Sequence, residues 1–510
     1  MDTTTPPDPG GGPTGRGGSA ASGSGGASAS GSGGVGPPCE ALGAALLGLA
    51  RERFARDALP ALSAYTAIEC LSPAFDDAWH ERGEIARAAE LLSAWTARRP
   101  IPGIAVEVVE IAGRTPVVLA EIPASDPERA GSTTLVYGHF DKQPPLGEWR
   151  EGLAPFTAVR EGDRLYGRGT ADDGYATFAA MIAVEALESA GGSHGRIVLL
   201  AESSEESGSP DLETYLDELA GRLGEVSLVV CLDSSCITYD RLWITASLRG
   251  NLVCELRVDV LEEAVHSGLA GGIVPSSFRV LRQLLDRIED ASTGEILLPE
   301  LRCDLPARRR TQIGEIATEF GDAAAGSFPT VPGLELAGTS ASERVERGTW
   351  AAALALTGIG GVPSVRDGGN VLRPFTAAKL SIRLPPRCDP EAARRALEEA
   401  LTRDPPEGAR VSITWEAPAA GWDAPEPAPW LTRALDEASV AAYGAPSRAM
   451  GLGGSIPFMS SLATRYPRAE LVATGVLGPA SNAHGPNEFL HIPAAQSLTA
   501  AIAYLLSAAP

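Results

Sequence analysis

The sequence lacks the features that mark membrane proteins and nucleic-acid-binding proteins. No run of about eighteen apolar residues occurs, so no membrane-spanning helix is expected. The 42 lysine and arginine residues are outnumbered by 65 aspartate and glutamate residues. The resulting net charge of -23 would repel nucleic-acid phosphates. We therefore expect neither a membrane nor a nucleic acid as partner.

Cysteine is scarce and scattered. The seven cysteines form no Cys-x-x-Cys pair, which argues against a metal site built from closely spaced thiolates. An odd and dispersed set also indicates a reducing compartment rather than a disulfide framework. We therefore expect a cytoplasmic protein.

Large apolar side chains are almost absent from residues 1–38, which are rich in glycine, serine, alanine and proline. This composition predicts a disordered tail and fits neither a signal-peptide core nor a packed segment. The whole chain has 510 residues and 44% hydrophobic content, so it can bury a large core in more than one domain.

Strand and helix patterns alternate along the first half of the chain. Apolar residues recur at helical spacing over 39–99, and 106–122 has the pattern of a hairpin around Gly113. Strand and helix patterns then alternate to about Thr245. This order predicts an α/β domain with a mostly parallel sheet, formed by 39–249 and completed by 419–510.

The pattern changes over residues 250–418. Strict alternation in 252–260 predicts a half-buried strand, and a helix is expected over 277–291. Further strands are expected over 378–384 and 411–416, with a helix beginning at Asp389 as cap and Pro390 at its first position. Residues 308–348 look irregular. We interpret the whole stretch as a compact inserted α+β domain.

Side chains that can bind metal ions follow several of the strand patterns. They lie in separate loops of the sequence: His139, Asp172, Glu206, Asp233 and His484. In open α/β sheets, ligands bind at the carboxyl ends of strands, so loops distant in sequence can converge there. Each residue alone would more often be a solvated side chain or a cap. Together they predict a site for two divalent metal ions.

Carboxylates and imidazoles suit zinc, manganese or cobalt, and composition alone does not choose between them. Two such ions together can activate one water at neutral pH. Glu205 and Glu206 are neighbours whose side chains should point apart, so one can bind metal while the other transfers protons. Asp141, two residues after His139, can hold that imidazole by its other nitrogen. Asp173 is expected to be a helix cap rather than a ligand.

At these positions the chain resembles the carnosinase, aminoacylase and carboxypeptidase G family of dinuclear zinc metallopeptidases, most closely its cytosolic dipeptidase branch. The matching pieces are Gly138-His-Phe-Asp141, Gly167-Arg-Gly-Thr-Ala-Asp-Asp173, Glu205-Glu-Ser-Gly208, Asp233, Val265-His-Ser-Gly268 and His484. The resemblance implies that Asp172 bridges two ions, with Glu206 and His484 at one and His139 and Asp233 at the other. It also implies Glu205 as general base and Asp141 as support.

The resemblance implies further roles in substrate binding. Residues 250–418 would form a lid and dimerisation domain. His266 would reach the site from the lid of a partner subunit and polarise the scissile carbonyl. Arg383 and the segment containing Gly454 and Ser455 would hold the substrate carboxylate, and Asn370 would line the pocket. The chain departs from many relatives because no lysine follows the paired aspartates in Asp172-Asp-Gly-Tyr175. Their substrate preference therefore does not carry over.

The sequence thus predicts a metal-dependent hydrolase that cleaves the amide bond of dipeptides or small peptides. One alternative is an N-acyl or N-carbamoyl amino acid amidohydrolase, which would use the same metals. Another is a non-catalytic metal-binding scaffold, although the presence of Glu205 argues against it. The alternating strand near Leu252 is expected to pair edge to edge with a second copy and form a homodimer.

Overall fold

The computed structural model describes residues 39–326, 328 and 330–510. The predicted disordered tail, residues 1–38, lies outside the described part. None of the helices in that part is long and apolar enough to cross a membrane.

A nine-stranded sheet forms the centre of the larger domain. Its strands, in sheet order, are β1 (Ala105–Val109), β2 (Val117–Ile122), β6 (Arg196–Glu202), β3 (Thr133–His139), β7 (Val226–Cys231), β17 (Glu470–Ala473), β8 (Trp243–Leu248) and β15 (Trp422–Asp423), with β16 (Arg448–Leu452) also beside β8. The central strands β6, β3, β7 and β17 run parallel, and the flanking pairs β1–β2 and β8–β15 are antiparallel. The predicted mostly parallel α/β sheet is confirmed at its centre, and the hairpin predicted over 106–122 is β1–β2.

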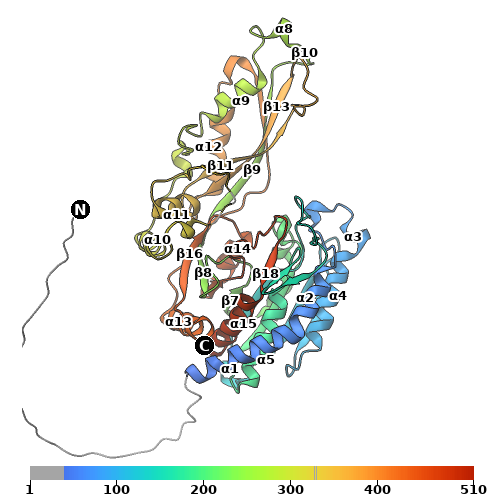
Figure 1. Cartoon of the computed structure of the whole chain (residues 1–510), viewed down its shortest axis with the longest axis vertical. Helices are drawn as coiled ribbons and strands as arrows, with labels where there is room; N and C mark the ends of the chain where they lie inside the picture. Colours follow the sequence, from blue (N-terminus) through green and yellow to red (C-terminus); the bar gives the residue numbers. More distant parts are fainter. Residues whose placement is uncertain (1–38, 327, 329) are drawn as a thin grey trace, which may run out of the picture. The chain divides into compact units, whose positions relative to one another are not determined.

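Helices cover both faces of this sheet. They are α1 (Cys39–Arg53), the π-helical turn η1 (Phe54–Ala58), α2 (Leu59–Thr66), α3 (Trp79–Arg82), α4 (Glu84–Ala97), α5 (Ala176–Ser189), α6 (Leu212–Glu218), α7 (Ala220–Leu223), α13 (Pro429–Tyr443), α14 (Pro457–Arg465) and α15 (Ile492–Ala508). Figure 1 shows α1, α5 and α15 side by side on one face.

Strand β3 contributes side chains to the hydrophobic cores on both faces of the sheet. All its residues are buried, and successive side chains point to opposite faces. Val136 packs with the helices α1, α5, α13 and α15, whereas Leu135 and Tyr137 pack with α6 and α14. Each fully buried side chain of this size contributes about 1.5–3 kcal/mol of transfer free energy. The carboxyl end of β3, which carries His139, is therefore held rigidly.

Short elements complete the larger domain. A small sheet in the order β18 (Phe489–His491), β5 (Arg164–Tyr166), β4 (Val159–Glu161) joins the segments around Asp172 and His484. The 3-10 turns of the chain are η2 (Pro73–Phe75), η3 (Pro127–Arg129), η4 (Glu205–Ser207), η5 (Pro299–Leu301), η6 (Gly321–Ala325) and η7 (Pro406–Gly408).

Residues 250–418, called the lid below, contain a second sheet. It is antiparallel, in the order β11 (Ala353–Gly360), β13 (Phe375–Leu384), β9 (Gly250–Asp259), β14 (Arg410–Trp415). A further pair is formed by β10 (Val265–His266) and β12 (Val371–Leu372). The lid helices are α8 (Ser267–Ala270), α9 (Ser277–Leu285), α10 (Ala307–Phe320), α11 (Ala341–Thr349) and α12 (Pro390–Thr402).

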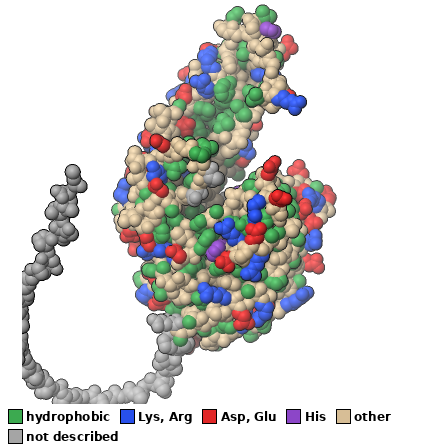
Figure 2. Space-filling view, in the orientation of Figure 1, with side chains coloured by type: hydrophobic (Ala, Val, Ile, Leu, Met, Phe, Trp, Pro, Cys, Tyr) green, Lys and Arg blue, Asp and Glu red, His purple; other side chains and the backbone are tan. Residues whose placement is uncertain are grey.

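The lid core follows the predicted alternation. Leu252, Leu256 and Val258 of β9 are buried against α9 and α12, and the intervening residues are more exposed. Asp389 caps α12 as expected, because its side chain accepts hydrogen bonds from the backbone N–H groups of Glu391 and Ala392. Figure 2 shows a group of apolar side chains on the lid, and charges of both signs spread over the lid and the larger domain.

Three expectations about the lid are wrong. The strand near Leu252 is not an edge strand, since β9 pairs with β13 on one side and β14 on the other. Its backbone groups are therefore already bonded. Residues 308–348 are largely helical rather than irregular, because Ile313, Ile316 and Val345 of α10 and α11 pack with Trp243 of β8. The helix predicted over 277–291 already ends at Leu285.

Candidate metal centre

The five predicted metal-binding side chains converge at the carboxyl ends of the parallel strands. His139 ends β3, Asp233 follows β7, and Glu206 lies in the turn after β6. Two groups of candidate ligands result, one of His139, Asp172 and Asp233, the other of Asp172, Glu206 and His484. Within each group the ligand atoms lie within 4.8 Å of one another. Asp172 is the member that the two groups share.

The two oxygens of Asp172 face different histidines. Asp172 Oδ1 lies 3.3 Å from His139 Nε2, and Asp172 Oδ2 lies 3.1 Å from His484 Nε2. Asp233 Oδ2 is 4.0 Å from the first imidazole, and Glu206 Oε2 is 3.3 Å from the second. A carboxylate placed between two sets of ligands in this way has the geometry that two neighbouring cations require.

The imidazole of His139 fits a metal ligand. The side chain is fully buried, yet Nε2 accepts and donates no hydrogen bond among the described residues. Its Nδ1 is within 3.2 Å of the Asp141 backbone oxygen and 3.4 Å of Asp141 Oδ1. A hydrogen bond from Nδ1–H would leave the lone pair on Nε2, the nitrogen that faces Asp172 and Asp233. A buried nitrogen without a hydrogen bond is costly unless a cation binds there.

Asp141 connects two parts of the centre. Besides orienting His139, its Oδ1 accepts a hydrogen bond from Glu205 N at 3.2 Å and its Oδ2 accepts one from Glu206 N at 3.0 Å. The supporting role that was expected for Asp141 is thus compatible with its contacts.

Electrostatics also indicate a cation site. Burial alone would lower the pKa of His484, but the carboxylates of Asp172 and Glu206 outweigh burial and raise this pKa to about 11. Burial raises the pKa of Glu205 well above its ordinary range, and nearby Asp233 raises it further. The crowded carboxylates therefore favour any positive charge placed among them, whether protons or divalent ions.

A cavity of about 760 Å³ opens onto this centre. Its wall includes Asp172, Glu205 and His484 from the larger domain and Val345 and Thr349 from lid helix α11. The carboxylate of Glu205 faces this cavity and is not committed to a hydrogen bond within the described residues. It can therefore act on a molecule bound there.

Two of the predicted substrate-binding residues lie in the cavity wall, and a third contacts them. Gly454 and Ser455 line the cavity, and Arg383 Nη1 donates a hydrogen bond to Ser455 Oγ at 3.0 Å. Arg383 is partly buried and pairs with no carboxylate among the described residues, and burial lowers its pKa. An unpaired guanidinium next to a cavity is suited to an anionic group of a ligand.

The other two predicted substrate residues lie elsewhere. His266 and Asn370 are exposed neighbours at the β10–β12 pair of the lid, where the Asn370 carbonyl accepts a hydrogen bond from Ser267 N at 3.0 Å. His266 Nδ1 accepts one from Gly268 N at 3.1 Å. Neither residue lines the cavity of its own chain. Their expected action on a partner's site remains a prediction.

Sequence reasoning was wrong for Asp173 and missed three residues. Asp173 is buried and does not cap α5, since its Oδ2 accepts a hydrogen bond from His139 N at 3.3 Å.

Gln143 donates from Nε2 to Glu206 Oε2 at 2.7 Å. Glu488 accepts from Asp172 N at 3.3 Å and pairs with Arg168, both side chains being fully buried. The proximity of Glu488 to His484 in the sequence was the available signal.

Arg249 is the third residue that was missed. It lines the cavity and bonds only backbone carbonyl groups, with Nε donating to Gly453 O at 3.0 Å. Burial, followed by repulsion from Arg383, lowers its pKa to about 10. No pattern in the sequence distinguishes this arginine from a surface residue.

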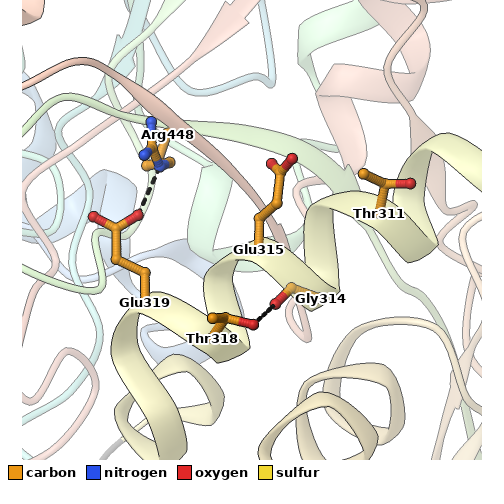
Figure 3. A pocket seen from close by; sticks show the side chains of 6 residues that line it. All are labelled: Thr311, Gly314, Glu315, Thr318, Glu319 and Arg448. Carbon is orange, nitrogen blue, oxygen red and sulfur yellow. Dashed lines mark hydrogen bonds and ion pairs between the residues drawn. The ribbon is translucent and has the colours of Figure 1, made fainter.

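A second hollow lies on the outer side of α10 (Figure 3). Arg448 faces Glu319 there and donates from Nε to its Oε2 at 2.9 Å, while Thr318 Oγ1 bonds the Gly314 carbonyl at 2.7 Å. No candidate metal cluster lies at this hollow in the described part of the chain. The cavity at Asp172 is therefore the better candidate for function.

Comparisons with known proteins show which proteins the chain is similar to. The model of a family described as peptidase family M20/M25/M40 matches residues 135–509. A cysteinylglycine-S-conjugate dipeptidase of Corynebacterium striatum is 28% identical over 387 residues, covering 74% of this chain and 82% of the relative. A Beta-Ala-His dipeptidase of Homo sapiens is 32% identical over 188 residues, covering 36% of each chain.

Solved structures share the fold. The dipeptidase Dug1p of Saccharomyces cerevisiae superposes with a TM-score of 0.75 at 22% identity, covering 92% of this chain and 99% of its own. Human carnosine dipeptidase 1 superposes with a TM-score of 0.73 at 22% identity, covering 93% and 100%. The fold expected from the sequence, an α/β domain with an inserted lid, is confirmed by these similarities.

Proposed function

The chain belongs to peptidase family M20/M25/M40, and from this premise we propose that it hydrolyses the amide bond of dipeptides with two divalent metal ions. The main support is the geometry of Asp172, which is shared by two groups of candidate ligands beside a cavity that Glu205 also lines. The similarity to a cysteinylglycine-S-conjugate dipeptidase and to a Beta-Ala-His dipeptidase favours dipeptides over acylated amino acids as substrates.

In this proposal the ligands divide into two sets that share Asp172. His139 and Asp233 hold one ion, and Glu206 and His484 hold the other. Two bound divalent ions lower the pKa of a nearby water and polarise the scissile carbonyl. We favour zinc, with manganese or cobalt as alternatives, since carboxylate and imidazole ligands suit all three.

The protein's own residues carry the proton transfers and the binding. Glu205 takes a proton from the attacking water and later gives it to the leaving amine. Its carboxylate faces the cavity and is not committed to a hydrogen bond within the described residues, so it can exchange that proton with the bound substrate. Arg383, together with the loop of Gly454 and Ser455, holds the carboxylate of the substrate and so directs the amide toward the centre.

We also propose that two copies associate through the lid, so that His266 and Asn370 of one chain complete the site of the other. The support is that both residues are exposed and absent from the cavity of their own chain. With β9 paired on both sides, the edges of the lid sheet are β11 and β14, and on β11 Leu356 is 49% and Ile359 47% exposed. Such an apolar edge strand favours pairing with a second copy.

A cytoplasmic location is part of the same proposal. Six cysteines, at positions 70, 231, 236, 254, 303 and 388, are free, as expected in a reducing compartment.

Replacing Glu205 tests the function. The Glu205→Ala protein should keep two ions per chain but lose about 10²–10⁴-fold in kcat, because it lacks the proton acceptor. Dipeptide hydrolysis and metal content are measured on the same samples, with and without chelator. A variant that keeps its ions and most of its turnover would refute the assignment of Glu205.

A substrate panel tests the class. Dipeptides, N-acyl amino acids and N-carbamoyl amino acids are compared by kcat/KM on the wild-type enzyme. Preference for acylated or carbamoylated amino acids would establish the alternative function. No turnover of any of them, in protein with both ions bound, would favour a metal-binding scaffold.

A further inference from the structure

Glu202 is a buried acidic side chain next to the metal centre that the proposed chemistry does not use. It is the last residue of β6 and is 1% exposed. No lysine, arginine or histidine lies within ion-pair distance of it in the described part of the chain. A buried carboxyl group without a cation must be stabilised by hydrogen bonds.

Three hydroxyl groups supply those hydrogen bonds. Tyr137 donates from its hydroxyl to Glu202 Oε1 in a short contact. Ser209 Oγ donates to the same oxygen at 2.8 Å, and Ser204 Oγ donates to Oε2 at 3.3 Å. The carboxyl group is therefore well satisfied, and each donor is fixed in turn by it.

The three donors belong to the segments that carry the proposed catalytic groups. Ser204 and Ser209 flank the turn that contains Glu205 and Glu206. Tyr137 lies two residues before His139 on β3. The backbone repeats the connection, because Phe140 N donates to Glu202 O at 2.9 Å. Glu202 thus joins the end of β3 to the turn after β6.

The turn is held from two sides. Asp141 binds the backbone N–H groups of Glu205 and Glu206, and Glu202 binds the hydroxyls on both flanks of the turn. The carboxylate of Glu205 itself accepts no hydrogen bond among the described residues. Its position therefore depends on the turn, and a displacement of about 1 Å can reduce a rate by about 100-fold.

The connection reaches the substrate loop as well. The ring of Tyr137 packs on Phe458 with ring centroids 3.7 Å apart. Phe458 belongs to α14, which begins two residues after Ser455. Through these contacts, Glu202 is linked to the proposed base Glu205, to the proposed metal ligands and to the loop before α14.

We propose that Glu202 is a positioning residue, which orients Glu205 for proton transfer by holding the turn between Ser204 and Ser209. This inference rests on the proposed hydrolase function. A purely structural role would alter stability alone, whereas a positioning role alters turnover in the folded, metal-loaded protein.

The test is a Glu202→Gln variant, which keeps the size of the side chain but exchanges one acceptor for a donor. We expect kcat to fall about 10–100-fold, with KM changed less than about threefold and two ions still bound. Because Glu206 lies on the same turn, the visible absorption of the cobalt-substituted protein should shift. Kinetics, metal content and the cobalt spectrum are measured together.

Two further variants cover the case in which Glu202→Gln does not fold. Ser209→Ala and Tyr137→Phe each remove one donor, and smaller losses of kcat in the same direction are expected. Glu185→Gln is the matched control: Glu185 is 2% exposed on α5 and is held by Arg99, away from the site. It should lose stability without a change in kcat per folded molecule.

The outcomes separate this inference from the proposed function. A folded Glu202→Gln protein with wild-type kcat, or with lost ions, would overturn the positioning role. If the wild-type protein cleaves nothing in the substrate panel, the proposed function fails. The cobalt spectrum is then the measurement that tests the positioning role of Glu202. In that case an unchanged spectrum in Glu202→Gln refutes the inference, and a shifted one supports it.

Discussion

At the scale of single residues, the centre depends on side chains that would be unfavourable anywhere else. His139 Nε2 is buried without a hydrogen bond, and the carboxylates around it repel one another. Such groups are kept only if a ligand compensates them, and divalent ions do so here in the proposed mechanism. Around the centre, Asp141, Gln143 and Glu488 make further hydrogen bonds to its side chains and backbone.

Glu202 makes the stability of the metal-free protein depend on pH. Burial raises its pKa from 4.5 to about 7. The folded state thus binds a proton that the unfolded state has released, and stability from this group is lost as pH rises through about 7. Between about pH 5 and about pH 8, the free energy of unfolding of the wild-type protein should fall by roughly 2–3 kcal/mol more than that of Glu202→Gln.

Urea unfolding of both chelator-treated proteins measures this difference. The titration of the other site residues cancels in the difference between the two free energies of unfolding, if the substitution leaves those residues unchanged. Parallel pH dependences for the two proteins would show that Glu202 titrates near its ordinary value.

At the scale of elements, the loop before α14 is held between the two domains. Gly453 has no room for a side chain, since a Cβ there would lie 2.6 Å from the Gly348 carbonyl of α11 and 2.9 Å from Arg249 Nη2. Gly454 and Ser455 follow directly. Any shift at Gly453 therefore moves the proposed carboxylate-binding loop.

Gly453→Ala should raise KM for dipeptides roughly tenfold, equal to ~1.4 kcal/mol of binding, and change kcat less. Gly314→Ala on α10 is the control, because a Cβ there meets no atom within 4 Å. It should leave KM unchanged and raise stability by about 0.5–1 kcal/mol. The KM values of the wild-type, Gly453→Ala and Gly314→Ala proteins are compared by steady-state kinetics. Equal values for the wild type and Gly453→Ala would show that the loop does not bind substrate.

The lid helices show where sequence patterns mislead. The strand pattern of β9 was clear because one of its faces packs against α9 and α12. The helices α10 and α11 were missed because their apolar residues are few and pack on β8 and β16 of the larger domain. A helix that is mostly polar, and whose partner is remote in sequence, leaves a weak periodic signal.

At the scale of the whole molecule, the proposed site needs two chains. Glu205 comes from one chain and His266 from its partner, so two inactive proteins should restore each other. When Glu205→Ala and His266→Asn dimers exchange subunits, each mixed dimer contains one intact site. Random exchange should then recover roughly a quarter of the wild-type activity.

The activity of the mixture is measured, and native mass spectrometry monitors the subunit exchange. A chain with both substitutions, mixed with Glu205→Ala, should recover nothing. Exchange without recovery in the first mixture would mean that His266 does not act on the partner's site.

The sequence by itself determined the order of strands and the types of residue at their ends. Strand-forming runs such as 133–138 specify buried strands, and a histidine or carboxylate directly after such a run must lie at the carboxyl end of the strand. Only the tertiary structure decided which oxygen of Asp172 faces which histidine, that Asp173 is buried rather than a cap, and that β9 lies inside its sheet. These outcomes depend on contacts between segments far apart in the chain, which no local pattern contains.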